Sequence, residues 1–250
     1  VGITNDGVGI FNTYPASGTL NGWSIALDPS GYFGLATYVA GTRQAILTSV
    51  NTVPLNVWSH IAITRSGSTY RIFINGVSQS LNWGATPQTQ NATWQRWNVS
   101  GYTGDIGDFQ YNHANPFDGY FAEYYFIDGQ ALTPSSFGST DLATGVFKPV
   151  KYTGTYGNNG FYLPFNDATS TTTIGYDRQL GLTDSSKNNW TSSGISVTSG
   201  TTYDVMRDSP TNYNDGSSNH GNYPSLNRVS THSSCVFSDG NMTAVGDNQG

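Results

Sequence analysis

The stretch that most constrains the fold of this chain runs from Trp58 to Val77 and reads WSHIAITRSGSTYRIFINGV. Two runs of β-branched and aromatic residues, 57–65 and 69–75, flank the turn-forming sequence SGS. Runs of this kind joined by a short polar turn predict a β-hairpin. A second turn signal, Asn75-Gly76, follows directly and predicts that the chain reverses again.

The alternation within this hairpin defines an apolar face. Val57, Ile61 and Ile63 share one face of the first run, because successive side chains of a strand point to opposite sides. Tyr70, Ile72 and Ile74 share one face of the second run. An apolar face of this size must be covered by another sheet. The hairpin therefore predicts a two-layer β architecture.

Short strands separated by Gly, Asn, Asp and Pro account for the rest of the first half of the chain. We predict them at 9–13, 22–27, 32–39 and 45–48. The run 117–128 (FDGYFAEYYFID) is the strongest single strand signal and is predicted near the centre of a sheet. A short helical piece is predicted to begin at Pro134, because proline is favoured at the first helical position. The 250 residues allow one large β domain or one domain with a smaller second unit.

The charge of the chain excludes two classes of partner. The net charge is -6, and the ten Lys and Arg residues form no basic run, so neither a nucleic acid nor an anionic membrane surface is expected. No run of apolar residues is long enough to span a bilayer, so membrane insertion is not expected either. The single cysteine, Cys235, cannot form an internal disulfide.

The hairpin, the sequence DIGD at 105–108 and the run PFDGYFAEYYFIDGQALTPSSFG at 116–138 resemble the laminin G-type branch of the concanavalin A-like lectin/glucanase superfamily. The resemblance covers residues 1–140 and implies an all-β fold, a concanavalin A-like jelly-roll sandwich of antiparallel sheets. We expect the family's first core strand to be missing before Val1 and the chain to be an excerpt of a longer protein.

The second half of the chain has a different composition, rich in Gly, Ser, Thr and Asn. The sequences VKYTGTYGNNGFYLPF at 150–165, DSSKNNW at 184–190 and RDSPTNY at 207–213 are similar to a segment that follows such lectin-like domains in bacteriophage virion proteins, chiefly tail-fibre and other structural or host-attachment proteins. We therefore predict a lectin-like sandwich at 1–145 and a less regular β-rich segment or linker at 146–250. The resemblance implies a location on the exterior of the virion, contacts with other virion subunits and a homo-oligomer.

The function expected from this resemblance is a non-catalytic structural and adhesion module that contacts host cell-surface glycan. Two alternatives stay open, a glycan-degrading depolymerase and a purely architectural module. Glycosidases use two carboxylates, and the only glutamate, Glu123, has Asp118 and Asp128 on the opposite face by strand parity. We therefore expect no enzyme, and we predict that Glu123 is a hydrogen-bonded structural carboxylate at the sheet. Cys235 and His232 lack a third orienting residue, and His60 in the hairpin is predicted to be a packed histidine.

A glycan site is predicted in the long loop that follows the hairpin. Sugar sites combine an aromatic platform with amide and carboxylate groups that fix the hydroxyls. The candidate residues are Trp83, Trp94, Trp97, Asn98 and Tyr102. The alternative is that these rings only pack the loop onto the sandwich.

Calcium is the cofactor that the resemblance implies, because many relatives hold Ca²⁺ near the rim of the sandwich. Its candidate ligands are Asp105, Asp108, Asn115 and Asp118, which carry the hard oxygen atoms that calcium prefers. The alternative is that these residues only form turns, since Asp and Asn before Gly are common turn residues.

Overall fold

The computed structural model describes residues 7–15, 22–39, 42–67, 69–83, 102–108, 116–167, 169–179, 187–198, 204–206, 208–211, 236–238 and 243–245. The chain divides into two compact units. Unit 1 comprises 1–119, 131–135 and 142–147, and unit 2 comprises 120–130, 136–141 and 148–250. The predicted domain boundary near Gly145 stays a prediction.

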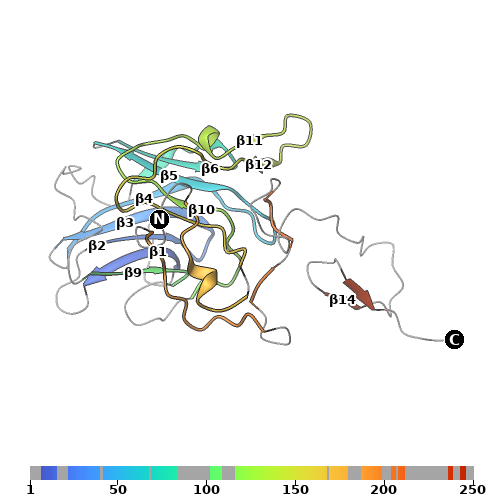
Figure 1. Ribbon diagram of the computed structural model, residues 1–250. Coiled ribbons are helices and arrows are strands. Elements are labelled where there is room, and N and C mark those ends of the chain that lie inside the picture. Colours follow the sequence, from blue (N-terminus) through green and yellow to red (C-terminus); the bar gives the residue numbers. More distant parts are fainter. Residues whose placement is uncertain are drawn as a thin grey trace. The chain divides into compact units, whose positions relative to one another are not determined.

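Unit 1 contains a six-stranded antiparallel sheet (Figure 1). Its strands, in spatial order, are β8 (Leu81–Trp83), β4 (Thr42–Thr52), β3 (Tyr32–Val39), β2 (Gly22–Leu27), β1 (Val8–Pro15) and β9 (Tyr102–Ile106). The predicted strands 22–27 and 32–39 match β2 and β3, while β1 and β4 extend beyond their predictions. Strand β4 is longer because its residues pair with β3 on one side and with β8 on the other.

The predicted hairpin is confirmed as part of a three-stranded sheet, made of β5 (Ile61–Ser66), β6 (Thr69–Ile74) and β7 (Val77–Ser78). Ile61 pairs with Ile74 and Ile63 with Ile72, so the apolar face lines up across the two strands, and Ile72 and Ile74 are buried. Strand β5 begins four residues later than predicted, so the expectation that Val57 lies on its apolar face is wrong: Val57 precedes the strand and is exposed. The turn between β6 and β7 has φ of 49° at Asn75 and 78° at Gly76, the left-handed pair that a tight hairpin turn requires.

The core of unit 1 includes large side chains on one face of the six-stranded sheet. Phe11 of β1 stands opposite Ile25 of β2, which stands opposite Leu35 of β3. Phe11 and Leu35 are buried, and the Phe11 ring lies 5.2 Å from that of Trp23. The opposite face carries small buried residues such as Ala26 and Ala36.

The described chain is almost entirely β-structure and loops, and its helical segments are the 3-10 turns η1 (Pro134–Ser136) and η2 (Thr173–Gly175). No helix within the described residues is long and apolar enough to cross a membrane. The predicted all-β fold with antiparallel sheets is therefore confirmed, as is the helical piece that begins at Pro134.

The prediction of a long central strand at 117–128 is wrong. Strand β10 covers only Tyr124–Phe126, and it pairs with β13 (Phe161–Leu163) in a two-stranded sheet of unit 2. The physical reason is the backbone of Glu123, whose φ of 54° is left-handed and cannot continue an extended strand. The aromatic residues that favour a strand here therefore do not form one long strand.

The remaining strands are short. They are β11 (Gly138–Thr140) with β12 (Phe147–Pro149), and β14 (Val236–Ser238) with β15 (Thr243–Val245).

Candidate functional site

Glu123 is the centre of a hydroxyl cluster in unit 2. Its Oε2 accepts hydrogen bonds from the hydroxyls of Tyr125 at 2.9 Å and Tyr162 at 3.0 Å. Its Oε1 accepts a third from the hydroxyl of Thr211 at 2.6 Å. Both carboxylate oxygens are therefore engaged by donors, which is how a partly buried carboxylate is stabilised without a cation.

The pairing of β10 with β13 positions two of these donors. Tyr125 stands directly opposite Tyr162, and their rings are stacked with centroids 4.5 Å apart and an angle of 7° between planes. Side by side, the two hydroxyls reach the same oxygen atom. Burial, followed by the charge of Asp177 and the nearby Tyr152 and Glu123, raises the pKa of the adjacent Tyr156 above its usual range.

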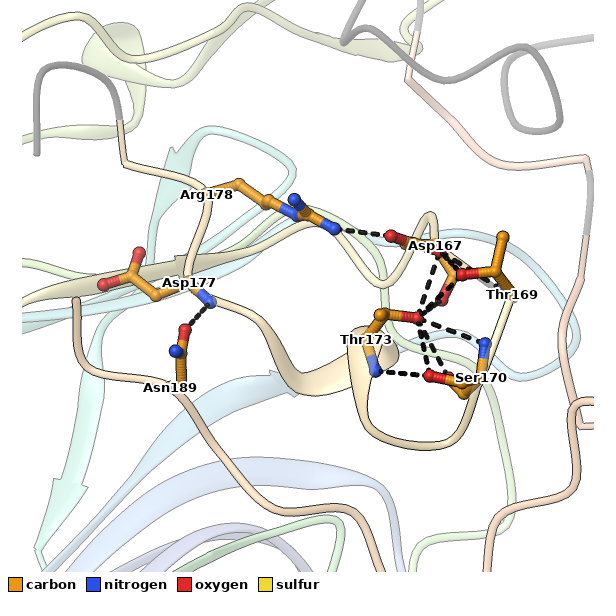
Figure 2. Close-up of polar contacts among 7 residues, drawn as sticks. All are labelled: Asp167, Thr169, Ser170, Thr173, Asp177, Arg178 and Asn189. Carbon is orange, nitrogen blue, oxygen red and sulfur yellow. Dashed lines mark hydrogen bonds and ion pairs between the residues drawn. The ribbon is translucent and has the colours of Figure 1, made fainter. Parts of the chain in front are cut away.

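Asp177 is a second carboxylate centre in unit 2 and is fully buried. Its Oδ1 accepts the backbone N–H groups of Tyr162 at 3.0 Å and Gln179 at 3.1 Å. Its Oδ2 accepts the Gln179 side-chain amide at 2.7 Å and the Asn188 N–H at 3.0 Å. The Asp177 N–H in turn donates to Asn189 at 2.9 Å, as Figure 2 shows. Four donors replace water around this charge. Because the partners of Asp177 lie at Tyr162, at Gln179 and at 188–189, this residue joins three chain segments.

Asp167 organises the loop that leads into η2 (Figure 2). One carboxylate oxygen accepts the backbone N–H of Thr169 at 3.2 Å and the hydroxyls of Thr169 at 2.6 Å and Thr173 at 3.1 Å. The other oxygen pairs with Arg178 at 2.5 Å. Partial burial opposes ionisation, but the hydrogen bonds from Thr169 and Thr173 and the Arg178 charge outweigh it and lower the pKa of Asp167.

These three carboxylates were not singled out by sequence reasoning as a group. The prediction that Glu123 is a hydrogen-bonded structural carboxylate is confirmed by its three hydroxyl donors, whereas the sequence pattern identifies neither Asp177 nor Asp167. The one available signal was an acidic residue within a segment that has few charges. Their partners Tyr162, Gln179 and Thr211 are too distant in sequence, or too common in type, to be recognised from a pattern.

The residues predicted for glycan binding are described only in part. Trp83 ends β8, opposite Leu47 of β4, and Tyr102 begins β9, opposite Pro15 of β1. These strands are the two edges of the six-stranded sheet, about 24 Å apart across five spacings of about 4.8 Å. Trp94, Trp97 and Asn98 lie outside the described residues. The glycan site stays a prediction, with its two ends at opposite edges of one sheet.

Of the residues predicted to bind calcium, Asp105 lies in β9 and Asp108 follows its end. Asp105 stands opposite Asn12 of β1, and the backbone carbonyl of Asp108 accepts a hydrogen bond from the Asn12 side chain. Asp118 is exposed, and Asn115 lies outside the described residues. Within the part of the chain that is described, no three His, Cys, Asp or Glu residues gather closely enough to hold a metal ion. The described residues do not assemble the ligand set by themselves, and calcium stays a prediction.

His60 is packed, as predicted. Its ring is stacked on that of Phe147 with centroids 4.0 Å apart and an angle of 19° between planes. Burial lowers the pKa of His60 to about 4, so the imidazole is neutral at neutral pH. Cys235 and His232 lie outside the described residues.

The family comparison agrees with the architecture of the first half of the chain. A family model described as the concanavalin A-like lectin/glucanases superfamily matches residues 4–136. No curated protein matches the chain. A crystal structure of residues 221–444 of an S-layer domain-containing protein from Clostridium thermocellum is 20% identical, with a TM-score of 0.24, over 53% of this chain and 61% of that one. The chain thus covers less than two thirds of that structure.

Proposed function

The chain belongs to the concanavalin A-like lectin/glucanases superfamily, and on this basis we propose that it is a non-catalytic adhesion module that binds glycan on a cell surface. The match to residues 4–136 covers the strands of the six-stranded and three-stranded sheets. Members of a superfamily with both lectins and glucanases can bind or cleave sugars, so the carboxylates decide between these activities.

The observation that supports a binding role is the hydrogen bonding of the Glu123 carboxylate. A glycosidase needs one carboxyl group that protonates the leaving oxygen and a second that acts as nucleophile or base, both facing the substrate. The only glutamate of this chain faces three hydroxyl donors of its own protein instead. Asp177 is likewise surrounded by four internal donors. These carboxylates hold unit 2 together, which favours binding over hydrolysis.

The glycan is proposed to contact the stretch from the end of β8 to the start of β9, where aromatic faces and an amide would come from Trp83, Trp94, Trp97, Asn98 and Tyr102. An aromatic face packs on the apolar C–H face of a sugar ring, while amide groups bind its hydroxyls. The low proportion of charged residues, 10%, suits recognition of a neutral polar ligand.

The context that we propose is the exterior of a bacteriophage particle, as part of a tail fibre or another surface protein. The support is the sequence similarity of 150–165, 184–190 and 207–213 to segments of such proteins. A single cysteine also suits a particle assembled in a reducing cytoplasm. In this context the partners would be other virion subunits, including further copies of the chain, and a host glycan.

A purely architectural role is the second candidate, and the exposed apolar side chains favour it. Leu55, Val57 and Val77 are 83%, 61% and 62% exposed, and all belong to unit 1. Exposed apolar surface of this kind is a common feature of protein contacts. If this role is correct, Leu55→Ser with Val57→Thr will reduce self-association in sedimentation measurements.

A glycan array probed with the whole 250-residue chain tests the adhesion proposal. We expect binding to at least one glycan, and a loss of at least about tenfold in affinity for Trp83→Ala and for the double variant Trp94→Ala/Trp97→Ala. The matched control is Trp58→Ala, because Trp58 is partly exposed and precedes the three-stranded sheet. Retention of full affinity in both tryptophan variants would mean that the glycan binds elsewhere on the chain. Binding to no glycan, or release of reducing ends from a bound glycan, would contradict the proposal.

A further inference from the structure

His60 lies at a fixed place beside the three-stranded sheet. Its backbone carbonyl accepts the Asn75 N–H at 2.7 Å, and its N–H donates to the Asn75 side chain at 2.8 Å. Because Asn75 belongs to the tight turn after β6, these two bonds hold the backbone of His60 to the sheet. The imidazole is then presented to Phe147, on which it stacks.

Phe147 contacts this part of unit 1 through its stack on His60. Residues 142–146 are all exposed, and Leu142 is completely so, whereas Phe147 is half-buried. The segment is grouped with unit 1, although its neighbours on both sides, 136–141 and 148 onward, belong to unit 2. The His60–Phe147 stack therefore lies where the chain passes from unit 1 into unit 2 along the sequence.

The environment of His60 accommodates a neutral ring only. Its Nδ1 is buried and has no hydrogen-bond partner within the described residues. The hydroxyl of the adjacent Ser59 is also buried and also has no such partner there. A neutral imidazole can leave one nitrogen as an unused acceptor, but an imidazolium has N–H groups at both nitrogens. Protonation would therefore create a buried donor without an acceptor and a buried charge.

The charged groups on neighbouring elements would not stabilise an imidazolium. The sequence has no Asp or Glu from residue 29 to residue 104. The charged residues of β5 and β6 are Arg65 and Arg71, and Phe147 is followed directly by Lys148, which pairs with Asp141. Burial is the cause of the low pKa of His60, about 4.

We propose that His60 is an acid-sensitive latch, which holds Phe147 and the segment 142–147 against the three-stranded sheet while neutral and releases them when protonated. The sign follows from linkage. The latched state binds the proton more weakly than the released state, in which His60 has its ordinary pKa of 6.5. The equilibrium constant that favours the latched over the released state is therefore largest above pH 6.5 and decreases as the pH falls. Below pH 4 it is up to about 300-fold smaller.

An attraction between imidazolium and the Phe147 ring would act in the opposite direction. The experiment must therefore separate titration of His60 from the presence of an aromatic stack. His60→Phe keeps a ring on Phe147 and cannot titrate. Phe147→Leu keeps an apolar side chain but removes the ring that covers the imidazole.

The test is an NMR titration of the whole chain from pH 7.5 to pH 3.5, with hydrogen-exchange protection of the Phe147 and Lys148 amides measured at each pH. The His60 signal is assigned by its absence in His60→Phe. We expect His60 to titrate near pH 4 in the natural chain and closer to its ordinary pKa in Phe147→Leu. Protection at Phe147 and Lys148 should fall by up to about 300-fold in the natural chain and by less than about threefold in His60→Phe.

The amide of Ile72, which is fully buried in β6, reports whether the sheet itself remains folded. A His60 midpoint near its ordinary value would overturn the proposal. So would an equal loss of protection at Phe147 in His60→Phe, or a protonated His60 that retains full protection of Phe147 while Ile72 stays protected.

Discussion

The hydroxyl of Thr211 donates a hydrogen bond of 2.6 Å to Oε1 of Glu123, across 88 positions of the sequence. Together with the hydroxyls of Tyr125 and Tyr162, it holds Glu123 in a left-handed backbone conformation, φ 54°. That conformation costs about 1–2 kcal/mol for a residue with a side chain. Three hydrogen bonds to one charged group are sufficient to offset this cost.

We predict that Glu123→Gln lowers the free energy of unfolding of unit 2 by about 1–3 kcal/mol, because charge-assisted hydrogen bonds become neutral ones. Urea denaturation followed by the fluorescence of Trp190, whose ring lies 5.1 Å from that of Phe161 in unit 2, measures this change. The matched control is Asp118→Asn at an exposed carboxylate. An equal effect of both substitutions would mean that net charge, and not this cluster, determines stability.

Thr211→Val should destabilise unit 2 by about 1–2 kcal/mol, because it leaves Oε1 of Glu123 without this donor while keeping the shape of the side chain. Thr211→Ser keeps the hydroxyl and should retain most of the stability. The same denaturation assay distinguishes them. If the two variants are equally stable, the bond to Glu123 contributes nothing measurable.

Asp177→Asn should have a larger effect, a loss of about 3–5 kcal/mol, because the new amide group would face N–H donors in a fully buried position. Thermal unfolding monitored by circular dichroism checks this prediction. Asp204→Asn is a suitable control, since Asp204 is exposed and accepts the Ser196 N–H at 2.6 Å. A stable Asp177→Asn protein would mean that the side chain can turn its oxygen to the donors.

The stability of unit 2 should depend on pH through Asp167. Its folded-state pKa lies below the ordinary value of 3.8, so it contributes stability above that value and loses the contribution as the pH falls toward the folded-state pKa. Asp167→Asn should remove this part of the acid dependence. Urea midpoints measured from pH 6 to pH 2 test it, with Arg178→Lys as a variant that retains the positive charge. Superimposable pH profiles of Asp167→Asn and the natural chain would contradict the assignment.

Unit 2 is built from segments on both sides of Gly145, and this predicts which fragments of the chain can fold. A fragment of residues 146–250 lacks β10 and Glu123, so β13 loses its partner strand and Thr211 its acceptor. We expect it to give a collapsed amide NMR spectrum, whereas a fragment of residues 120–250 keeps all of unit 2 and gives dispersed signals. A folded fragment 146–250 would support the boundary near Gly145 instead.

The hairpin at β5 and β6 illustrates which features can be predicted from sequence. Its register depends on alternation within about fifteen neighbouring residues and on two local turn signals, and both are local properties. Strands β2 and β3 were predictable for the same reason. The run 117–128 has an equally strong strand signal, yet its strand is confined to Tyr124–Phe126. There, a left-handed residue stabilised by partners such as Thr211, far along the chain, overrides local propensity.

By itself, the sequence determined the all-β class, the alternating faces of the hairpin and the position of η1, because side-chain periodicity and turn chemistry act over a few residues. Only the tertiary structure decided which donors surround the carboxylates and that the ring of Phe147 covers His60. A carboxylate at Glu123 or Asp177 could serve catalysis, metal binding or scaffolding, and the choice depends on which donors surround it. Those donors come from separate segments that meet only in the folded chain, where burial makes each unsatisfied charge costly.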